Sequence, residues 1–362
     1  MPNPIAAVVP PSSGMANDAK EGEESIRGTQ PLRSGWNGAE RESARIDVSV
    51  CIANWNCRDL LQACLQSLLD QPQGVRVETI VADNASTDGA PEMVAREFPE
   101  VILHRNSTNV GFARANNQAA QHARGRYLFF LNNDTVVPPG ALGRLVHYAE
   151  AHPEVGMIGP RLRDGQGQPQ VSYRQRPTAG TLLHRTSLLR WTGLLRRAYR
   201  RYRRQDFDPE TTRPVEVLMG AAMLLPRDVF FSCGGWDEGF CFGGEDLDLS
   251  TRVGQRHPIV YHPGVEITHF GRVSTRQHIG YASSNMAIGF LRYLRKCGYA
   301  WPVLTLYKLV VTLDAPLQVA GKGLQYLWRR LRGQHAKAEK SRLAMQGQAY
   351  FLVRGLPAFW RT

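Results

Sequence analysis

The sequence lacks the short signatures of several large classes of nucleotide-binding and metal-binding proteins. No G-x-G-x-x-G fingerprint follows the first predicted strand, at residues 47–53, and no Walker A loop occurs, which argues against dehydrogenases and P-loop ATPases. The six cysteines form no C-x-x-C pair of the kind that binds zinc. RNP, zinc-finger and helix-turn-helix signatures are also missing, so we expect no nucleic-acid partner despite the net charge of +12.

Signals for disulfides and for secretion are equally scarce. The scattered cysteines are typical of buried apolar side chains in a reducing compartment. The apolar run at residues 5–9 has no positive region before it and is too short for a signal peptide. Residues 1–45 are rich in polar and turn-forming residues without periodicity, so we expect a disordered N-terminal tail on a cytoplasmic protein.

From residue 46 onward the chain alternates short apolar runs with amphipathic stretches. We expect strands at residues 47–53, 77–82, 101–104, 127–131 and 155–158, and helices at 58–69, 91–98, 111–124 and 140–151. This alternation predicts an α/β fold with a mostly parallel, Rossmann-like sheet flanked by helices. A chain of 362 residues can hold one large domain of this kind or two small ones.

Residues 161–213 interrupt the alternation with Gly, Gln, Pro and Arg, so we expect an insertion or flexible loop with a helix around 181–204. Seven arginines fall within residues 190–204. Such a block suits an anionic partner, although a solvated helix face is the alternative. Regular structure then returns, with a helix predicted at 247–256, short strands at 258–262 and 265–269, and a long helix at 277–297.

The C-terminal part contains an apolar segment, Trp301–Leu331, interrupted by Lys308 and Asp314 and expected to kink at Pro316. We judge that it falls short of the ~20 mostly uncharged apolar residues of a spanning helix. Its Trp, Tyr and Arg anchors favour a helix at the membrane surface. Packing of the segment onto the rest of the protein is the alternative.

Polar clusters follow three of the predicted strands. They are Asn54-Trp55-Asn56, Asp83-Asn84-Ala85-Ser86 and Asn132-Asn133-Asp134. Because parallel strands end at one edge of a sheet, these side chains are expected to line one ligand-binding crevice. A single Asp in such a place is more often a turn former or helix cap, so the inference depends on the clusters occurring together.

The motifs VSVCIANWN, IVADNASTDGA, NVGFARANNQA, YLFFLNNDTVV, GGWDEGFCFGGEDLDLSTRV and THFGRVS together resemble the family 2 glycosyltransferases, and in particular their bacterial rhamnosyltransferase-like branch. The resemblance covers about residues 47–275 in order and in spacing. It implies a GT-A fold, an inverting mechanism, a nucleotide-sugar donor and a divalent metal, Mn²⁺ or Mg²⁺.

For the donor site, the resemblance implies a nucleotide-binding role for one set of residues and a metal-binding role for another. The donor-binding residues would be Ala53, Trp55, Asp83, Gly111, Arg114, Asn116, Asn132 and Asn133. Asp134 matches the last carboxylate of the family's D-x-D motif and would bind the metal, and His269 would join it. Because Asn132 stands where many members have Asp, we expect modest metal affinity.

For the acceptor site, Glu245-Asp246 matches the family's ED pair, in which the Asp is the general base and the Glu also contacts the acceptor. Trp236 would line the acceptor site. An inverting transfer needs a base to take the proton of the attacking hydroxyl. Asp248 would point elsewhere on the same helix. A helix N-terminus that only complements its dipole is the alternative explanation of this acidic run.

The expected protein is therefore an inverting transferase that moves a sugar such as rhamnose to a lipid-linked or polysaccharide acceptor in cell-envelope glycan synthesis. We expect a GT-A domain at residues 46–275 and a helical, membrane-associated region at 276–362, which places the protein at the cytoplasmic face of the cell membrane. The alternatives are a sugar nucleotidyltransferase, whose Gly-rich signature is missing after the first strand, and a non-catalytic nucleotide-sugar-binding protein. The sequence leaves the oligomeric state open.

Overall fold

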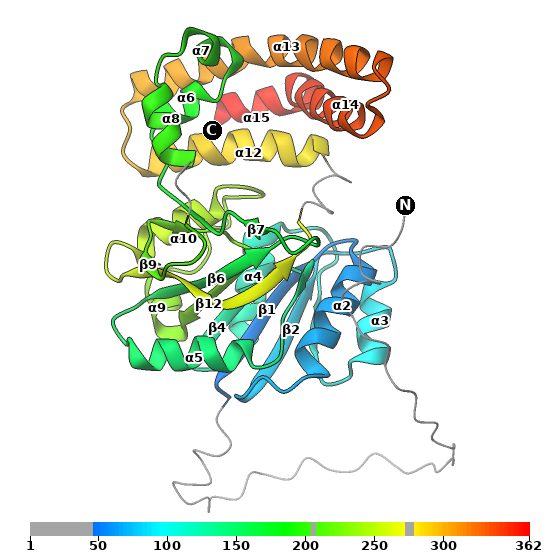
Figure 1. The fold of residues 1–362 in the computed structure, drawn as a ribbon, viewed down its shortest axis with the longest axis vertical. Coiled ribbons are helices and arrows are strands. Elements are labelled where there is room, and N and C mark those ends of the chain that lie inside the picture. Colours follow the sequence, from blue (N-terminus) through cyan, green and yellow to red (C-terminus); the bar gives the residue numbers. More distant parts are fainter. Residues whose placement is uncertain (1–45, 204–207, 272–278) are drawn as a thin grey trace, which may run out of the picture.

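The computed structural model describes residues 46–203, 208–271 and 279–362 (Figure 1). Within them the chain forms a sheet covered by helices and, at one end of that sheet, a group of helices that includes the C-terminal residues. The disordered tail expected at residues 1–45 lies outside the described residues and stays a prediction.

The first half of the sheet is parallel, as the alternation predicts. Its strands, in the spatial order β3-β2-β1-β4, are β1 (Val48–Asn54), β2 (Val77–Asp83), β3 (Ile102–Arg105) and β4 (Tyr127–Leu131). The connecting helices are α2 (Arg58–Leu69), α3 (Ala90–Glu97) and α4 (Phe112–His122). Because helices cover both faces of this sheet, its central strands are nearly continuous apolar runs, and six of the seven residues of β1 are buried.

The second half of the sheet is mixed. Its strands are β5 (Thr135–Val136), β6 (Met157–Arg163), β11 (Ala222–Pro226) and β12 (Ile259–His269), and its helices are α5 (Ala141–Ala151), α9 (Arg227–Ser232) and α10 (Glu245–Val253). The spatial order continues from β4 as β11-β6-β12-β5, and β11 runs antiparallel to both of its neighbours. The two strands expected at residues 258–262 and 265–269 are one strand, whose pairing with β6 shifts register after His262.

The insertion is ordered over its described residues. Short strands β7 (Pro169–Gln170), β8 (Tyr173–Arg174), β9 (Arg213–Pro214) and β10 (Val217–Leu218) accompany three short helices, α6 (Ala179–His184), α7 (Ser187–Thr192) and α8 (Arg196–Arg203). The single helix expected around residues 181–204 is therefore wrong. Thr178 and Thr186 cap α6 and α7 with their hydroxyls, and Gly193 ends α7 in a left-handed conformation, so the chain restarts its helix at each of these residues.

The C-terminal helices pack together as a bundle that also holds α6 and α7. They are α12 (Ile279–Lys296), α13 (Trp301–Leu331), α14 (His335–Tyr350), a π-helical turn (Phe351–Gly355) and α15 (Leu356–Arg361). Figure 1 shows α13 on the far side of this bundle from the sheet, with α12 nearest to the sheet. One helix runs through Pro316, and the bundle has its own apolar core around Phe290, Tyr307 and Phe359.

Helix α13 has one packed face and one exposed apolar face. Asp314 is fully buried on the packed face, where it accepts a hydrogen bond of 3.1 Å from the backbone N–H of Leu188 in the first turn of α7. The exposed face carries large apolar residues at helical spacing; we call these nine residues the apolar stripe: Trp301, Leu306, Leu309, Leu313, Leu317, Leu324, Leu327, Trp328 and Leu331. Within the described part of the chain, α13 alone is long and apolar enough to cross a membrane, by length and composition. The expectation that this segment falls short of that standard is therefore wrong.

The cysteines follow their expected chemistry only in part. Cys51, Cys57 and Cys64 are buried, and burial raises the pKa of each thiol, to about 11 for Cys57 and about 12 for Cys64. Cys241 and Cys297 are exposed, which corrects the expectation of six buried thiols. All six are free thiols.

Candidate active site

The ends of β1 and β2 are joined by the side chains that follow them. Asn54 and Asp83 are register partners, and the Asn54 Nδ2 donates to Asp83 Oδ1 at 2.9 Å. Asp83 also accepts from the backbone N–H and the hydroxyl of Ser86, at 2.8 and 2.6 Å, and only 2% of the residue is exposed. Asp83 therefore fixes the loop after β2, and one of its lone-pair positions remains for a ligand.

The end of β4 joins the same network. Asn133 Nδ2 donates to Asn54 Oδ1 at 2.7 Å, so the amides and the carboxylate form a continuous row across three parallel strand ends. Asn132 instead points toward the end of β12, where its Nδ2 lies 3.4 Å from His269 Nε2. The expected convergence of the strand-end clusters is thus present in the structure.

Asp134 and His269 lie side by side because β5 pairs with the end of β12. His269 is the register partner of Thr135, and the backbone N–H of Phe270 donates to the carbonyl of Asp134 at 2.9 Å. His269 Nε2 comes within 3.3 Å of Asp134 Oδ1. On the other side of the ring, Nδ1 lies 3.0 Å from Gln170 Oε1, and Gln170 Nε2 donates to the His269 carbonyl at 2.6 Å.

This pair fits a divalent cation. Gln170 donates with its Nε2 and so presents Oε1 as the acceptor of a proton on Nδ1, which leaves a lone pair on Nε2 facing the Asp134 carboxylate. His269 Nε2 and Asp134 Oδ1, 3.3 Å apart, can therefore both donate an electron pair to one cation. Ligands of one octahedral ion at about 2.1 Å lie about 3 Å apart, close to this separation. No group of three or more His, Cys, Asp and Glu side chains in the described residues is placed to hold a metal ion, so diphosphate oxygens or water would complete the shell.

The other residues expected at the donor site fall into two groups. Ala53 and Trp55 flank Asn54 at the end of β1 and are partly exposed, and Arg114 is largely exposed on α4, with Nε 3.7 Å from Glu238. Gly111 caps α4 with φ of 88°, and a side chain there would meet the backbone of Cys241. Asn116 is buried; its Nδ2 donates to the Phe112 carbonyl of its own helix, which leaves only its Oδ1, without a hydrogen-bond partner in the described residues, for a ligand.

Trp236 lies in the core rather than on an open surface. Its indole is 1% exposed and makes edge contacts with Phe112 and Phe130, so in this conformation it offers no surface to an acceptor. Its backbone is held by Asn117, which accepts from the Trp236 N–H and donates to the Trp236 carbonyl, both at 2.9 Å. Trp236 thus anchors the loop before α10 to the donor half.

Glu245 and Asp246 begin α10 after Gly243 and Gly244, which have φ of 82° and 100°. These glycines let the loop pack tightly on α12, where the carbonyl of Gly243 lies against Gly289. The Asp246 carboxylate accepts from the Leu247 N–H at 2.8 Å and forms an ion pair of 2.6 Å with Arg174. The buried start of α10 is therefore held from two sides.

Glu245 sits beside this ion pair in an apolar setting. Burial, with the charge of Asp246 as a smaller cause, raises the pKa of Glu245 to about 8. Its Oε2 is buried and has no hydrogen-bond partner within the described ranges. Glu245 is consequently a neutral acid at neutral pH, and Asp246 is the carboxylate that a general base requires.

Asp248 faces away from Asp246, as its spacing on α10 predicts. It forms ion pairs with Arg252, at 2.7 Å, and with Lys296 of α12, at 2.5 Å. Lys296 and Arg292 also pair with Asp237, at 2.7 and 2.8 Å. This network fastens the helical bundle to the sheet.

The donor and acceptor halves meet at Gly220-Ala221. The Ala221 carbonyl accepts a hydrogen bond of 2.9 Å from the Asn132 N–H, and a Cβ on Gly220 would lie 3.5 Å from the Cβ of Asp246. The two acidic groups therefore border one edge of the sheet, separated by a short glycine-containing segment.

Sequence reasoning missed three residues that support these groups: Gln170, Arg174 and Asn117. The first two lie on β7 and β8, inside the segment expected to be flexible, and no local pattern marks them. Asn117 follows Asn116 on a helix, and the tandem amides were the only available signal. The segment after β6 thus contacts both candidate groups. Gln170 contacts His269 of the Asp134–His269 pair, and Arg174 pairs with Asp246.

A mixed sheet with this row of amides, an Asp–His pair and a carboxylate-led helix at one edge defines a GT-A-type glycosyltransferase. The chain belongs to glycosyl transferase family 2, whose profile matches residues 49–230. The expected family and fold class are confirmed, and the nucleotidyltransferase and non-catalytic alternatives are set aside.

Two relatives and one solved structure illustrate the similarity. The chain is 30% identical, over 55% of its length and 68% of the relative's, to an N-acetylglucosaminyl-diphospho-decaprenol L-rhamnosyltransferase of Mycobacterium tuberculosis. It is 29% identical, over 57% of its length, to the O-antigen biosynthesis protein RfbC of Myxococcus xanthus, but spans only 16% of that protein. A crystal structure of GalNAc-T7 with UDP, GalNAc and Mn²⁺ shares the fold, with a TM-score of 0.51, 18% identity and coverage of 68% of this chain and 48% of that one.

Proposed function

We propose that the protein transfers a deoxyhexose such as rhamnose, with inversion, from a nucleoside diphosphate-sugar to a hydroxyl group of a lipid-linked acceptor. The observation that carries this proposal is the arrangement of Asp134–His269 and Asp246 along one sheet edge, joined through Gly220-Ala221. The choice of sugar and acceptor draws on the Mycobacterium tuberculosis relative, whose name states an L-rhamnosyl transfer to a diphospho-decaprenol substrate.

The donor nucleotide would bind along the row Asp83–Asn54–Asn133. The free lone pair of Asp83 would accept from the base or ribose, and the partly exposed Trp55 would lie against the base. Gly111 and Arg114, at the start of α4, would approach the diphosphate, because a helix N-terminus and a guanidinium both favour anions.

Asp134 and His269 would hold a divalent ion, Mn²⁺ or Mg²⁺, with Gln170 orienting the imidazole. When bound, such an ion neutralises charge on the departing nucleoside diphosphate. Asn132 lies within reach of His269 but contributes no charge, which supports the expectation of modest metal affinity.

Asp246 would take the proton of the acceptor hydroxyl as that oxygen attacks the anomeric carbon from the face opposite the leaving nucleoside diphosphate. Its ion pair with Arg174 keeps the carboxylate in place before the acceptor arrives. Glu245, neutral and only partly exposed, would donate a hydrogen bond to the acceptor without competing for its proton.

The bundle would place the protein on the inner face of a membrane. Its apolar stripe runs along the exposed face of α13, while Asp314 ties the opposite face to α7, so α13 fits an orientation parallel to the membrane better than a crossing one. Exposed arginines of α7 and α8, among them Arg190, Arg196 and Arg200, would attract anionic lipids.

The decisive experiment is a transfer assay with dTDP-rhamnose and a prenyl-diphospho-sugar acceptor, with Mn²⁺ or Mg²⁺ added. We expect product formation that requires both the metal and the acceptor. A panel of other nucleotide sugars serves as the control. Transfer from another sugar would change the substrate assignment, whereas a complete lack of transfer or donor hydrolysis across the panel would contradict the proposed activity.

A further inference from the structure

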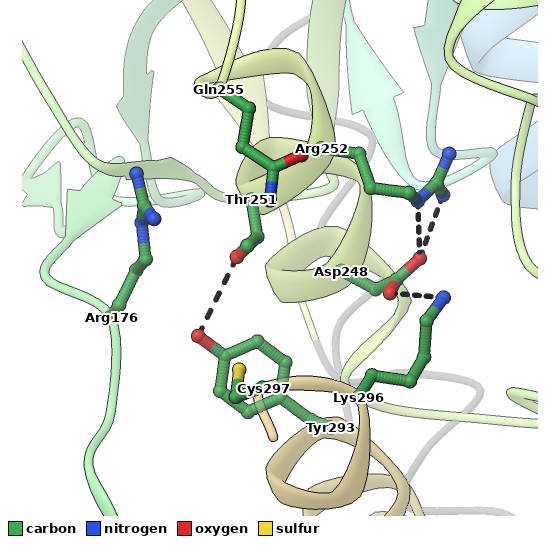
Figure 2. Close-up of a pocket in the computed structure, with 8 residues that line it drawn as sticks. All are labelled: Arg176, Asp248, Thr251, Arg252, Gln255, Tyr293, Lys296 and Cys297. Atoms are coloured by element: carbon green, nitrogen blue, oxygen red, sulfur yellow. Dashed lines mark hydrogen bonds and ion pairs between the residues drawn. The ribbon is translucent and has the colours of Figure 1, made fainter.

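A pocket lies where the sheet meets the bundle, between α10 and α12 (Figure 2). It has a volume of about 320 Å³. Helix α10 supplies one wall and α12 supplies the other, and the segment after β8 adds one arginine. The lining residues are Arg176, Asp248, Thr251, Arg252, Gln255, Tyr293, Lys296 and Cys297.

The pocket carries an excess of positive charge. Asp248 contributes its one carboxylate, and both oxygens are occupied: Oδ2 accepts from Arg252 Nε at 2.8 Å, and Oδ1 lies 2.5 Å from Lys296 Nζ. Arg176 stands apart from this cluster in Figure 2. Within the described ranges it has no ion-pair partner, and its Nε is buried without a hydrogen-bond partner. The guanidinium of Arg176 is thus left with unused donors.

Neutral donors complete the lining. The Tyr293 hydroxyl lies 3.5 Å from that of Thr251, which donates its own proton to the Leu247 carbonyl at 2.7 Å. The exposed Gln255 follows just after the end of α10. Hydroxyl, amide and guanidinium groups arranged around a small cavity form the donor set that proteins use for phosphate oxygens. An arginine that served only to dock α12 would be expected to pair with Asp237 or Asp248, as Arg292 and Lys296 do.

We propose that this pocket binds a phosphate or diphosphate group. Arg176 is two residues from Arg174, which pairs with Asp246, and α10 carries both Asp246 and three of the pocket residues. Residues 246 and 251 are about 7–8 Å apart along a helix axis. The anion could therefore be the diphosphate of the acceptor, an assignment that rests on the proposed function, or a free anion that binds independently of it.

The test is a calorimetric titration with inorganic pyrophosphate at low ionic strength, with EDTA present so that metal-dependent binding at the donor site is suppressed. Arg176→Gln should weaken binding by tenfold or more. The matched control is Arg256→Gln, which removes an exposed arginine just beyond the same helix. The control should bind pyrophosphate like the wild type, and thermal unfolding should confirm that all the proteins are folded.

A second variant guards against a folding defect in Arg176→Gln. Gln255→Glu places a carboxylate at the exposed end of the pocket with little change in shape, and it should also weaken pyrophosphate binding by tenfold or more. Wild-type affinity for pyrophosphate in folded Arg176→Gln and Gln255→Glu proteins would overturn the proposal. So would a lack of measurable binding by the wild-type protein at millimolar pyrophosphate.

Kinetics then distinguish the two sources of the anion. If the pocket holds the acceptor's diphosphate, Arg176→Gln raises the KM for the acceptor about tenfold and leaves the KM for the donor unchanged, and pyrophosphate competes with the acceptor. If the pocket holds a free anion, the acceptor KM does not change although pyrophosphate binding is lost. The titration needs no catalysis, so it can succeed even where the proposed transfer activity fails.

Discussion

The two halves of the candidate site are built from different interactions. The donor half is a row of amides and one carboxylate, Asp83–Asn54–Asn133, held by short neutral and charge-assisted hydrogen bonds between adjacent strand ends. The acceptor half is held by the Arg174–Asp246 ion pair, which joins segments 72 residues apart. The proposed nucleotide site is thus prearranged by neighbouring strands, whereas the proposed base depends on a distant arginine for its position. The two halves should respond differently to substitution.

The largest expected effect is a loss of turnover when Asp246, in the acceptor half, is replaced. Asp246→Asn keeps the side chain's size but removes the base, so the transfer rate should fall by about 10²–10⁴-fold. The donor dissociation constant should change little. Asp248→Asn, on the same helix, should be much milder because Asp248 pairs with Arg252 and Lys296 instead. Initial rates measured beside donor affinity check this, and near-normal transfer by Asp246→Asn would remove the base from the mechanism.

The converse substitution should act on donor binding. Asp134→Asn removes the charge that faces His269, so we expect nucleotide-sugar affinity in Mn²⁺ to fall by about 10–100-fold or more. Gln170→Ala, which only frees the imidazole, should have a smaller effect in the same direction. Calorimetry with Mn²⁺ and with EDTA separates metal-dependent from metal-independent binding of the nucleotide sugar. Without metal, both variants should bind the nucleotide sugar as tightly as the wild type does. Equal metal-dependent binding by Asp134→Asn would show that the pair holds no ion.

Membrane binding should depend on the bundle and be independent of either half. Leu313→Glu and Leu324→Glu together place two charges in the apolar stripe, and each lost leucine is worth about 1.5–3 kcal/mol of burial. We expect vesicle binding to fall at least tenfold while transfer to a water-soluble acceptor persists. Ala336→Glu and Gln346→Glu together, both on the exposed surface of α14, are the charge-matched control. If the double variant still pellets with anionic vesicles, the stripe is not the membrane-binding surface.

The smallest expected effect is a pH dependence of stability in the acceptor half. The folded-state pKa of Glu245, about 8, lies above its ordinary value of 4.5. Between these values the unfolded chain loses a proton that the folded protein keeps, so stability falls as pH rises. At pH 7 the free energy of unfolding of Glu245→Gln should therefore exceed that of the wild type by ~1–3 kcal/mol, and near pH 4 the two should be equal. Denaturant titrations at both pH values measure this difference. A difference in the free energy of unfolding that stays constant between pH 4 and pH 7 would contradict the raised pKa of Glu245.

The sheet and the donor half were predictable because their signals are local. Each parallel strand is an apolar run followed by its own polar cluster, and parallel strands end together. Pro263 and Gly264 suggested a break between two strands, but β12 keeps its pairing with β6 by shifting register there. Thr178 and Thr186 are helix-capping residues, so the three short helices of the insertion were detectable in principle.

The side chains that support the Asp134–His269 pair and Asp246 were not predictable in this way. Arg174 and Gln170 act across 72 and 99 residues of sequence, from a Gly- and Gln-rich segment that has no helical or strand periodicity. Trp236 was expected to line the acceptor site, yet its ring packs against Phe112 and Phe130. Such contacts depend on how distant elements pack, which single-sequence patterns do not record.

The hydrogen bond between Asp314 and the first turn of α7 sets the rotational phase of α13. Asp314 is fully buried against a backbone N–H, so rolling α13 about its axis or sliding it by a residue would break that bond. The direction in which the apolar stripe faces is thereby linked to the position of α7. An acceptor anchored in a lipid leaflet would meet the catalytic edge at one height and one tilt, and its reach would decide which of its hydroxyls is glycosylated.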